Sequence, residues 1–213
     1  MRHFFALFFS LIIPLIVFLR VSSEASVRFG LNGWESLIFG GVASIISAAL
    51  TGYIFTRKIK KGKSFLKAMR FIGFVVLAAY LSLGMIYINR LHLKSTQLNR
   101  YYKELHPVLR VSVVAATIFD RHLVVTDIGR NPDDYISMGL KKRKHSWHFK
   151  QKTGFIHAVD LRTINRNELL NQLTELYFKI SGFNTLRHTG TNDHLHVELP
   201  ITKETYSIKK LLN

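Results

Sequence analysis

The chain of 213 residues contains no cysteine, only four prolines, and 13 acidic residues against 30 lysines and arginines. Without cysteine it can form neither a disulfide nor a thiolate metal site, so nitrogen and oxygen atoms must bind any metal ion. Acidic residues are scarcest in residues 1–96, where only Glu24 and Glu35 accompany 12 lysines and arginines. The chain therefore divides into two parts of unlike composition.

Long apolar runs mark residues 1–90 as a membrane region, with helices expected over 4–20, 36–56 and 71–89. Roughly 20 apolar helical residues cross a bilayer core about 30 Å thick. The first run could also be a signal peptide, because it follows Met1-Arg2-His3. It is long for a signal core, however, and "VSSEASV" is a poor cleavage site, so we expect an uncleaved helix.

Charged loops predict the orientation of these helices. The loop 57–70 has seven lysines and arginines and no acid, which places it and the N-terminus in the cytoplasm and the C-terminal part outside. The positive charge is then explained by the orientation of the chain in a membrane. We therefore expect a lipid bilayer, and no nucleic acid, as a partner. Ser44, Ala48 and Gly52 recur every four residues, which favours close helix packing within the chain or in a homo-oligomer.

The second part begins with a polar connector, 91–106, and continues as one domain over 107–213. Periodicity predicts a helix after Pro107 and a second helix over 165–182. Strands are expected over 123–128, 155–161 and 194–200. This pattern indicates an α+β domain with a small, mostly antiparallel sheet.

Two of the expected strands carry histidine and carboxylate side chains. Alternation places His194, His196 and Glu198 on one face of the last strand, and apolar side chains on the other. In "FIHAVDL", Asp160 shares a face with Ala158, whereas His157 points to the opposite face. Imidazole nitrogens combined with a carboxylate oxygen are a typical zinc ligand set, although other divalent ions accept the same ligands.

The segments "HSWH…GFIHAVDL" and "DHLHVEL" resemble the zinc peptidases of the D-Ala-D-Ala carboxypeptidase and L-alanyl-D-glutamate endopeptidase superfamily, whose fold is also that of the hedgehog signalling domain. The resemblance covers residues 108–200 and none of the membrane region. It implies three zinc ligands: His148, Asp160 and His196. It further implies a catalytic base or its orienting partner at His194 or Asp193, and substrate-binding residues at Ser146 and Arg130. Arg130 would hold a substrate carboxylate or stabilise the oxyanion.

One position departs from the family pattern. The family's first ligand lies seven residues before the aspartate, and here that residue is Thr153. His148 lies 12 residues before Asp160, so a longer loop must bring it back. His157 is the alternative first ligand, although strand alternation turns it away. We expect His122, His145, His188 and Glu198 to be surface or rim residues.

Topology and resemblance together predict a membrane-anchored zinc hydrolase that cleaves peptide bonds of peptidoglycan, as a carboxypeptidase or an endopeptidase. Its domain would face the periplasm or the exterior of a bacterial cytoplasmic membrane, or of a viral membrane. Two alternatives remain open. The domain could be an inactive wall-binding module of the same fold, or the chain could be an endolysin-like viral lysis protein whose helices act in the membrane.

Overall fold

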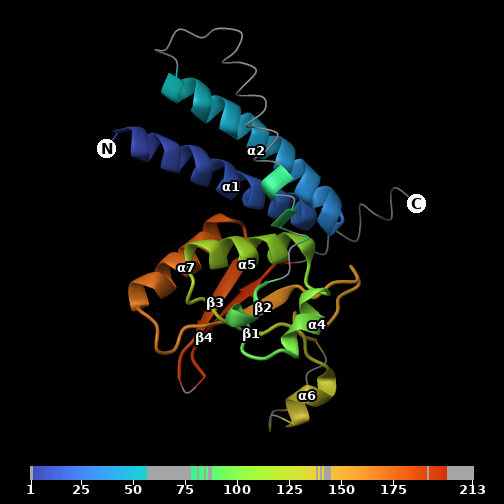
Figure 1. Ribbon diagram of the computed structural model, residues 1–213. Helices are drawn as coiled ribbons and strands as arrows, with labels where there is room; N and C mark the ends of the chain where they lie inside the picture. The colour runs from blue at the N-terminus through green and yellow to red at the C-terminus, as the bar shows by residue number, and fades with distance from the viewer. Residues whose placement is uncertain are drawn as a thin grey trace, which may run out of the picture.

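A computed structural model describes residues 2–56, 78–80, 82–83, 85, 88–137, 139, 141, 145–190 and 192–200. The basic loop 57–70 and most of the expected third helix, 71–89, lie outside the described residues. The helices and strands form three layers, with a sheet at one side and an N-terminal helical hairpin at the other (Figure 1).

Helices α1 (Arg2–Phe29) and α2 (Gly33–Thr56) form that hairpin. Asn32 caps α2, because its Oδ1 accepts hydrogen bonds from the backbone N–H groups of Trp34 and Glu35 at 3.0 Å. The Glu35 carboxylate accepts the Asn32 N–H in return, which completes a capping box. Gly40 allows close approach of the two helices, since a Cβ there would lie 2.4 Å from the Phe18 carbonyl oxygen.

Among the described residues, one helical segment is long and apolar enough to cross a membrane, the 19 residues Gly33–Thr51 of α2. Ser44, from the expected small-residue motif, is buried and donates a hydrogen bond from its hydroxyl to the Pro14 carbonyl oxygen of α1 at 3.0 Å. The small-residue side of α2 near Ser44 therefore packs within the chain, against α1.

The sheet is antiparallel and has the strand order β1-β2-β4-β3. Its strands are β1 (Val125–Asp127), β2 (Ala158–Arg162), β3 (Asn184–His188) and β4 (His194–Glu198). Helix α7 (Glu168–Ile180) leads from β2 to β3 at the far edge, and β4 returns between them. The predicted α+β class with a small antiparallel sheet is confirmed. Strand β3 was not predicted, because its alternation of polar and half-buried side chains is that of an edge strand.

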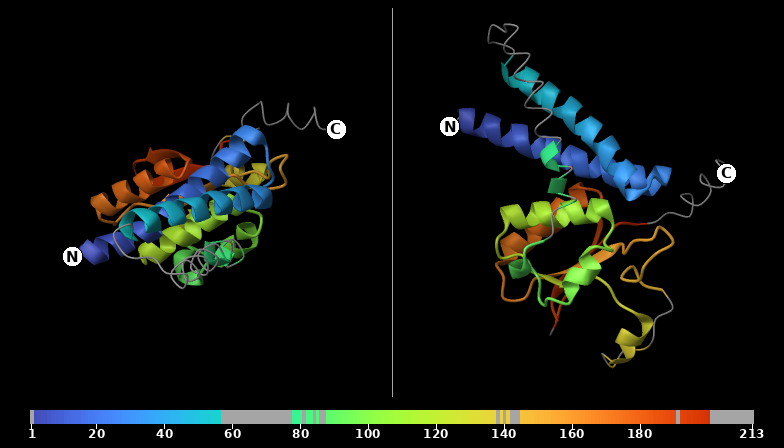
Figure 2. Two further views of the ribbon diagram at one scale, coloured as in Figure 1. Left: turned by 90° about the horizontal axis from the view of Figure 1, so that it is seen from above. Right: turned by 45° about the vertical axis from the view of Figure 1, so that its right-hand side comes forward.

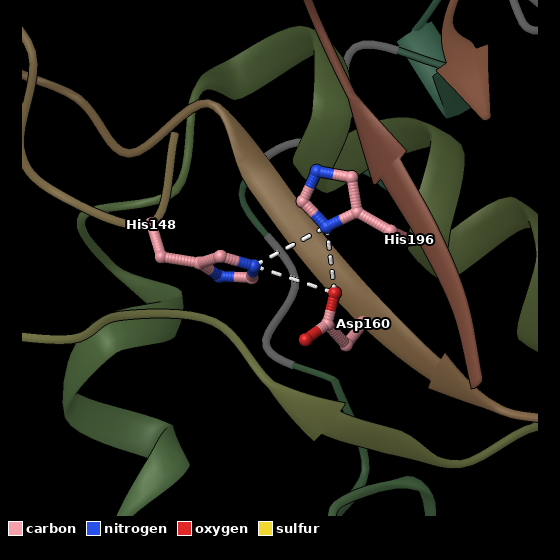
Figure 3. A group of neighbouring side chains, drawn as sticks. All are labelled: His148, Asp160 and His196. Atoms are coloured by element: carbon pink, nitrogen blue, oxygen red, sulfur yellow. Dashed lines mark hydrogen bonds and ion pairs between the residues drawn. The ribbon is translucent and has the colours of Figure 1, made fainter. Parts of the chain in front are cut away.

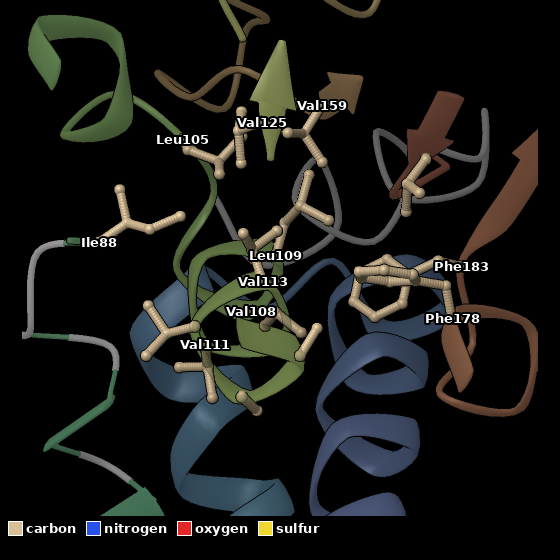
Figure 4. Close-up of a cluster of buried hydrophobic side chains, with 14 of the residues drawn as sticks. Ile88, Leu105, Val108, Leu109, Val111, Val113, Val125, Val159, Phe178 and Phe183 are labelled. Atoms are coloured by element: carbon tan, nitrogen blue, oxygen red, sulfur yellow. The ribbon is translucent and has the colours of Figure 1, made fainter. Parts of the chain in front are cut away.

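Helices α5 (Pro107–Phe119) and α7 cover one face of the sheet. Between the sheet and these helices lies the core, which includes Leu109, Val159 and Phe178 (Figure 4). In β4 the apolar residues Leu195 and Val197 are buried and face this core, as strand alternation predicts. The opposite face of the sheet carries the histidines and carboxylates.

The segment expected as a connector belongs to the core. It contains the 3-10 helix η1 (Arg90–His92) and the short helix α4 (Leu98–Tyr102). Leu93, Tyr102 and Leu105 are buried in the same apolar cluster as α5. Leu93 and Leu105 also form isolated parallel bridges with Val125 and Ile156. The domain therefore starts before residue 107, and residues 91–106 do not form a free linker. A further short helix, α6 (Pro132–Ser137), lies away from the layers.

The turn end of the hairpin packs directly on this domain. The Ser23 hydroxyl donates to the Gly182 carbonyl oxygen at 2.8 Å, and the Ser26 Oγ lies 3.3 Å from His106 Nε2. A Cβ added to Gly33 would lie 2.4 Å from the Pro107 ring. From this contact the N-terminal end of α1 and the C-terminal end of α2 extend away from the sheet (Figure 2).

Candidate functional site

The site is built on the sheet face opposite the helices. Asp160 in β2 pairs directly with His196 in β4, and the next pair on the same face is Arg162 with His194. Because side chains on paired antiparallel residues lie side by side, the register alone brings Asp160 and His196 together. The His196 Nδ1 and the Asp160 Oδ1 are 2.8 Å apart.

His148 reaches this pair from a loop. Its Nδ1 donates to the Ile128 carbonyl oxygen at 2.8 Å, and its carbonyl oxygen accepts the Arg130 N–H at 3.1 Å. A neutral ring that donates from Nδ1 has its lone pair on Nε2. That Nε2 lies 3.3 Å from the Asp160 Oδ1 and 3.3 Å from the His196 Nδ1 (Figure 3).

These three residues could hold a metal ion, since one ligand atom from each lies within 4.8 Å of the others. A tetrahedral zinc ion with bonds of about 2.0–2.1 Å needs ligand atoms about 3.3 Å apart. The two distances from His148 match that value, and the shorter His196–Asp160 distance is that of a hydrogen bond which a metal ion would replace. The predicted ligands thus fit zinc, and other divalent ions also accept this donor set.

Hydrogen bonds and ion pairs keep the Asp160 carboxylate ionised. Burial by itself would raise its pKa, but the rings of His148 and His196, each of which donates to the carboxylate when the facing nitrogen is protonated, hold the pKa well below its usual range. Arg130 Nη2 also donates to the Asp160 Oδ2 at 3.2 Å. Asp160 therefore offers a charged oxygen to the site over the whole physiological pH range.

His196 is held from both sides. Its Nε2 lies 3.2 Å from the Glu198 Oε2, while its Nδ1 faces Asp160. Burial alone would lower its pKa, but the hydrogen bonds with Asp160 and Glu198 raise it to about 9. His196 would have to release a proton from Nδ1 to hold a metal ion there, and the Glu198 carboxylate would fix the ring through Nε2. From the sequence, we expected Glu198 only as a rim residue. Strand alternation nevertheless put it on the same face as His196, which could have indicated this contact.

The two predicted bases differ in their surroundings. The His194 Nδ1 donates to the Asn192 carbonyl oxygen at 2.6 Å, and its Nε2 lies 3.8 Å from the Asp160 Oδ2. Asp193 instead accepts hydrogen bonds from Arg187 at 2.6 and 2.9 Å and from the Thr163 hydroxyl at 2.6 Å. The hydrogen bonds from Arg187 and Thr163 lower the pKa of Asp193 to about 2. Of these two residues, His194 is the one that turns a ring nitrogen, Nε2, toward the cluster.

The alternative first ligand, His157, lies outside the cluster, as its strand parity indicated. Its Nδ1 donates to the Leu199 carbonyl oxygen at 3.2 Å, and its Nε2 lies 2.7 Å from the Thr153 hydroxyl. Thr153, at the position where the family has its histidine, thus contacts His157 instead of the cluster. The His157 ring lies 4.8 Å from the ring of His106, beneath the hairpin.

The two predicted substrate-binding residues lie beside the cluster and support its geometry. Arg130 pairs with Asp127 and Asp160, and its guanidinium lies over the Tyr135 ring at 5.4 Å. The Ser146 hydroxyl accepts the Tyr135 hydroxyl at 2.9 Å and the His148 N–H at 3.3 Å. Ser146 and Tyr135 therefore fix the loop that carries His148. Tyr135 had no recognisable signal in the sequence.

The cluster lies in a cleft of about 1970 Å³. Its lining includes Lys94, Arg130, Trp147, Arg162 and Leu186. The cleft is therefore large enough for an extended ligand and presents both cationic and apolar surface to it. Comparison with protein-family models, with curated proteins and with solved structures gives no match.

Proposed function

We propose that this protein is a membrane-anchored zinc peptidase that cleaves peptide bonds of peptidoglycan. The observation that carries the proposal is the meeting of His148, Asp160 and His196, which come from a loop and two strands. They are the three residues that the family resemblance implies as zinc ligands. His148 fills the first position despite its long spacing to Asp160, which supports an active site over an inactive module.

The chemistry follows from the chain's own side chains. A zinc ion held by the cluster would polarise a carbonyl and lower the pKa of a bound water towards 7. His194 accepts a proton at Nε2, because its Nδ1 is committed to a backbone carbonyl. Arg130 offers its guanidinium to a substrate carboxylate or a developing oxyanion from the same side of the cleft as Asp160.

The packing of the hairpin supports the proposed topology. The contacts of Ser23, Ser26 and Gly33 hold the hairpin turn and the N-terminal end of α2 against the domain. If α2 crosses the membrane, both therefore lie on the same side of the bilayer as the domain. The C-terminal end of α2 leads to the basic loop 57–70, which the positive-inside rule assigns to the cytoplasm. The cleft then faces the wall compartment, where peptidoglycan lies.

The test uses the purified full-length chain in detergent. We expect about one zinc ion per chain by elemental mass spectrometry, and release of shortened muropeptides from isolated walls. His196→Ala should lose both properties. His122→Ala is the matched control, because this histidine is exposed and lies outside the cleft. A chain that binds zinc without turnover would indicate a wall-binding module, and a chain that binds no metal would refute the zinc site.

A further inference from the structure

Helix α7 carries a stripe of apolar side chains on its exposed surface. Leu169, Leu173, Leu176 and Ile180 are 62%, 51%, 53% and 45% exposed. At 100° per residue these four side chains fall within about 60° of one another. An apolar stripe on a helix ordinarily marks the side packed against the core. Here a different side, with Asn171 and Phe178, is buried.

Contacts on the other sides of α7 show where the stripe points. Phe178 is buried at the sheet side beside Phe183, and the Tyr177 hydroxyl donates to the Ser112 carbonyl oxygen of α5 at 2.9 Å. The stripe lies roughly opposite Phe178 around the helix. It therefore points away from the sheet, toward the side on which α1 and α2 lie (Figure 1).

This surface continues beyond α7. Ile118 and Phe119, at the end of α5, are also exposed. Asp120 directly follows them and pairs with Arg166 just before α7, so the end of α5 and the beginning of α7 lie together. At the other end of α7, the Gly182 carbonyl oxygen accepts the Ser23 hydroxyl of α1. The stripe thus runs from the end of α5 to the hairpin.

We propose that this surface, Leu169, Leu173, Leu176 and Ile180 with Ile118 and Phe119, contacts the lipid bilayer beside the inserted hairpin. The inference rests on the proposed membrane insertion of α2. Lipid is favoured as the occupant because α2 exposes apolar side chains on the same side of the domain, including Ile46 and Leu50. An amphipathic helix at this level buries its apolar side among headgroups and upper acyl chains. The cleft, on the opposite sheet face, then points away from the membrane.

The absence of cysteine makes the test direct, since any introduced cysteine is the only one. Full-length Leu173→Cys, labelled with an environment-sensitive fluorophore, is reconstituted in phosphatidylcholine–phosphatidylglycerol vesicles that contain lipids with a quencher near the headgroup. Gln172→Cys is the matched control, because it neighbours Leu173 and is exposed outside the stripe. Ile46→Cys independently reports insertion of α2 and is measured in vesicles whose lipids carry the quencher on the acyl chain, because position 46 lies inside the 19-residue apolar span.

We expect the label at 173 to shift to shorter wavelength and lose most of its emission to the quencher, while the label at 172 keeps its emission. If 173 stays unquenched while 46 is quenched, the lipid contact is refuted and the insertion of α2 stands. If 46 is also unquenched, the membrane insertion itself fails. Disulfide-linked dimers of Leu173→Cys in vesicles, with the label shielded from the lipid quencher, would overturn the inference in favour of a second copy.

Discussion

Acid should destabilise this fold through His157, which is buried with His106 beneath the hairpin. Burial is the largest cause that lowers the pKa of His157, from 6.5 to about 4. Its Nδ1 donates to Leu199, so its Nε2 accepts the Thr153 hydroxyl and the ring is neutral. Burial also holds the pKa of His106 well below its ordinary value. The native state therefore resists protonation where the unfolded chain accepts it.

The sign and size follow from linkage. Above pH 6.5 neither state protonates His157, so the native state keeps its full stability. As the pH falls toward 4, the unfolded state gains a proton that the native state excludes, and stability is lost. The loss from His157 is about 2 kcal/mol at about pH 5 and about 3 kcal/mol at about pH 4. His106 adds a loss of the same sign.

The shifted pKa values of His196 and Asp193 change the stability little between about pH 6.5 and about pH 5. The raised pKa of His196, about 9, stabilises the native state below pH 6.5 by a constant amount. The lowered pKa of Asp193, about 2, removes stability only below its ordinary value of 3.8. A chelator removes the contribution of any bound metal. The slope between about pH 6.5 and about pH 5 therefore reports the buried histidines.

The assay is thermal unfolding of the full-length chain in detergent, followed by tryptophan fluorescence. Trp147 is a local reporter, since its ring lies 6.4 Å from that of His157. A loss of about 2 kcal/mol should lower Tm by about 4–8 °C. His122→Ala should show the wild-type slope, because the removed side chain is exposed. A constant Tm from about pH 7 to about pH 5 would refute the argument.

Three further outcomes are expected. Glu198→Gln should weaken zinc binding about 10-fold to 100-fold in chelator competition, because the carboxylate that orients His196 is lost; unchanged affinity would show that Glu198 does not support the ligand. Zinc affinity should fall about tenfold per pH unit below 9, because His196 must release a proton to bind metal; titration calorimetry at several pH values measures this, and a flat profile contradicts it. Gly33→Ala should destabilise the chain by about 1–3 kcal/mol, since its Cβ would meet the rigid Pro107 ring at 2.4 Å; thermal unfolding tests it, with Ala43→Ser as a milder change in the same helix.

Strand alternation was sufficient to predict one half of the site. It placed His196 and Asp160 on polar strand faces, and the antiparallel pairing then made them neighbours. The approach of His148 was implied only by the family resemblance, because the loop 149–157 has no fixed path until contacts with Ile128 and Ser146 hold His148. Alternation also correctly turned His157 away from Asp160.

Other features depended on tertiary contacts that no local pattern encodes. Asp193 looked equivalent to His194 as a base, but pairing of β3 with β4 brings Arg187 beside it. The apolar stripe of α7 correctly predicted a helix. The stripe is exposed, however, because the helix packs on the domain through Phe178 and Tyr177, which lie on other sides of it. The third expected helix lies mostly outside the described residues and stays a prediction.

The apolar residues that anchor segment 91–106 in the core would limit the way the proposed peptidase searches for substrate. Leu93, Tyr102 and Leu105 anchor that segment in the core, and the hairpin turn is hydrogen-bonded to the domain. A domain on a long flexible linker sweeps a volume that grows with the linker length. In the part of the chain that the structure describes, the hairpin contacts the domain without such a tether, so the reach of the domain would be set by its own dimensions. Under the proposed function, strands of wall polymer would have to come to the membrane surface to be cut, and polymer farther out would stay beyond its reach.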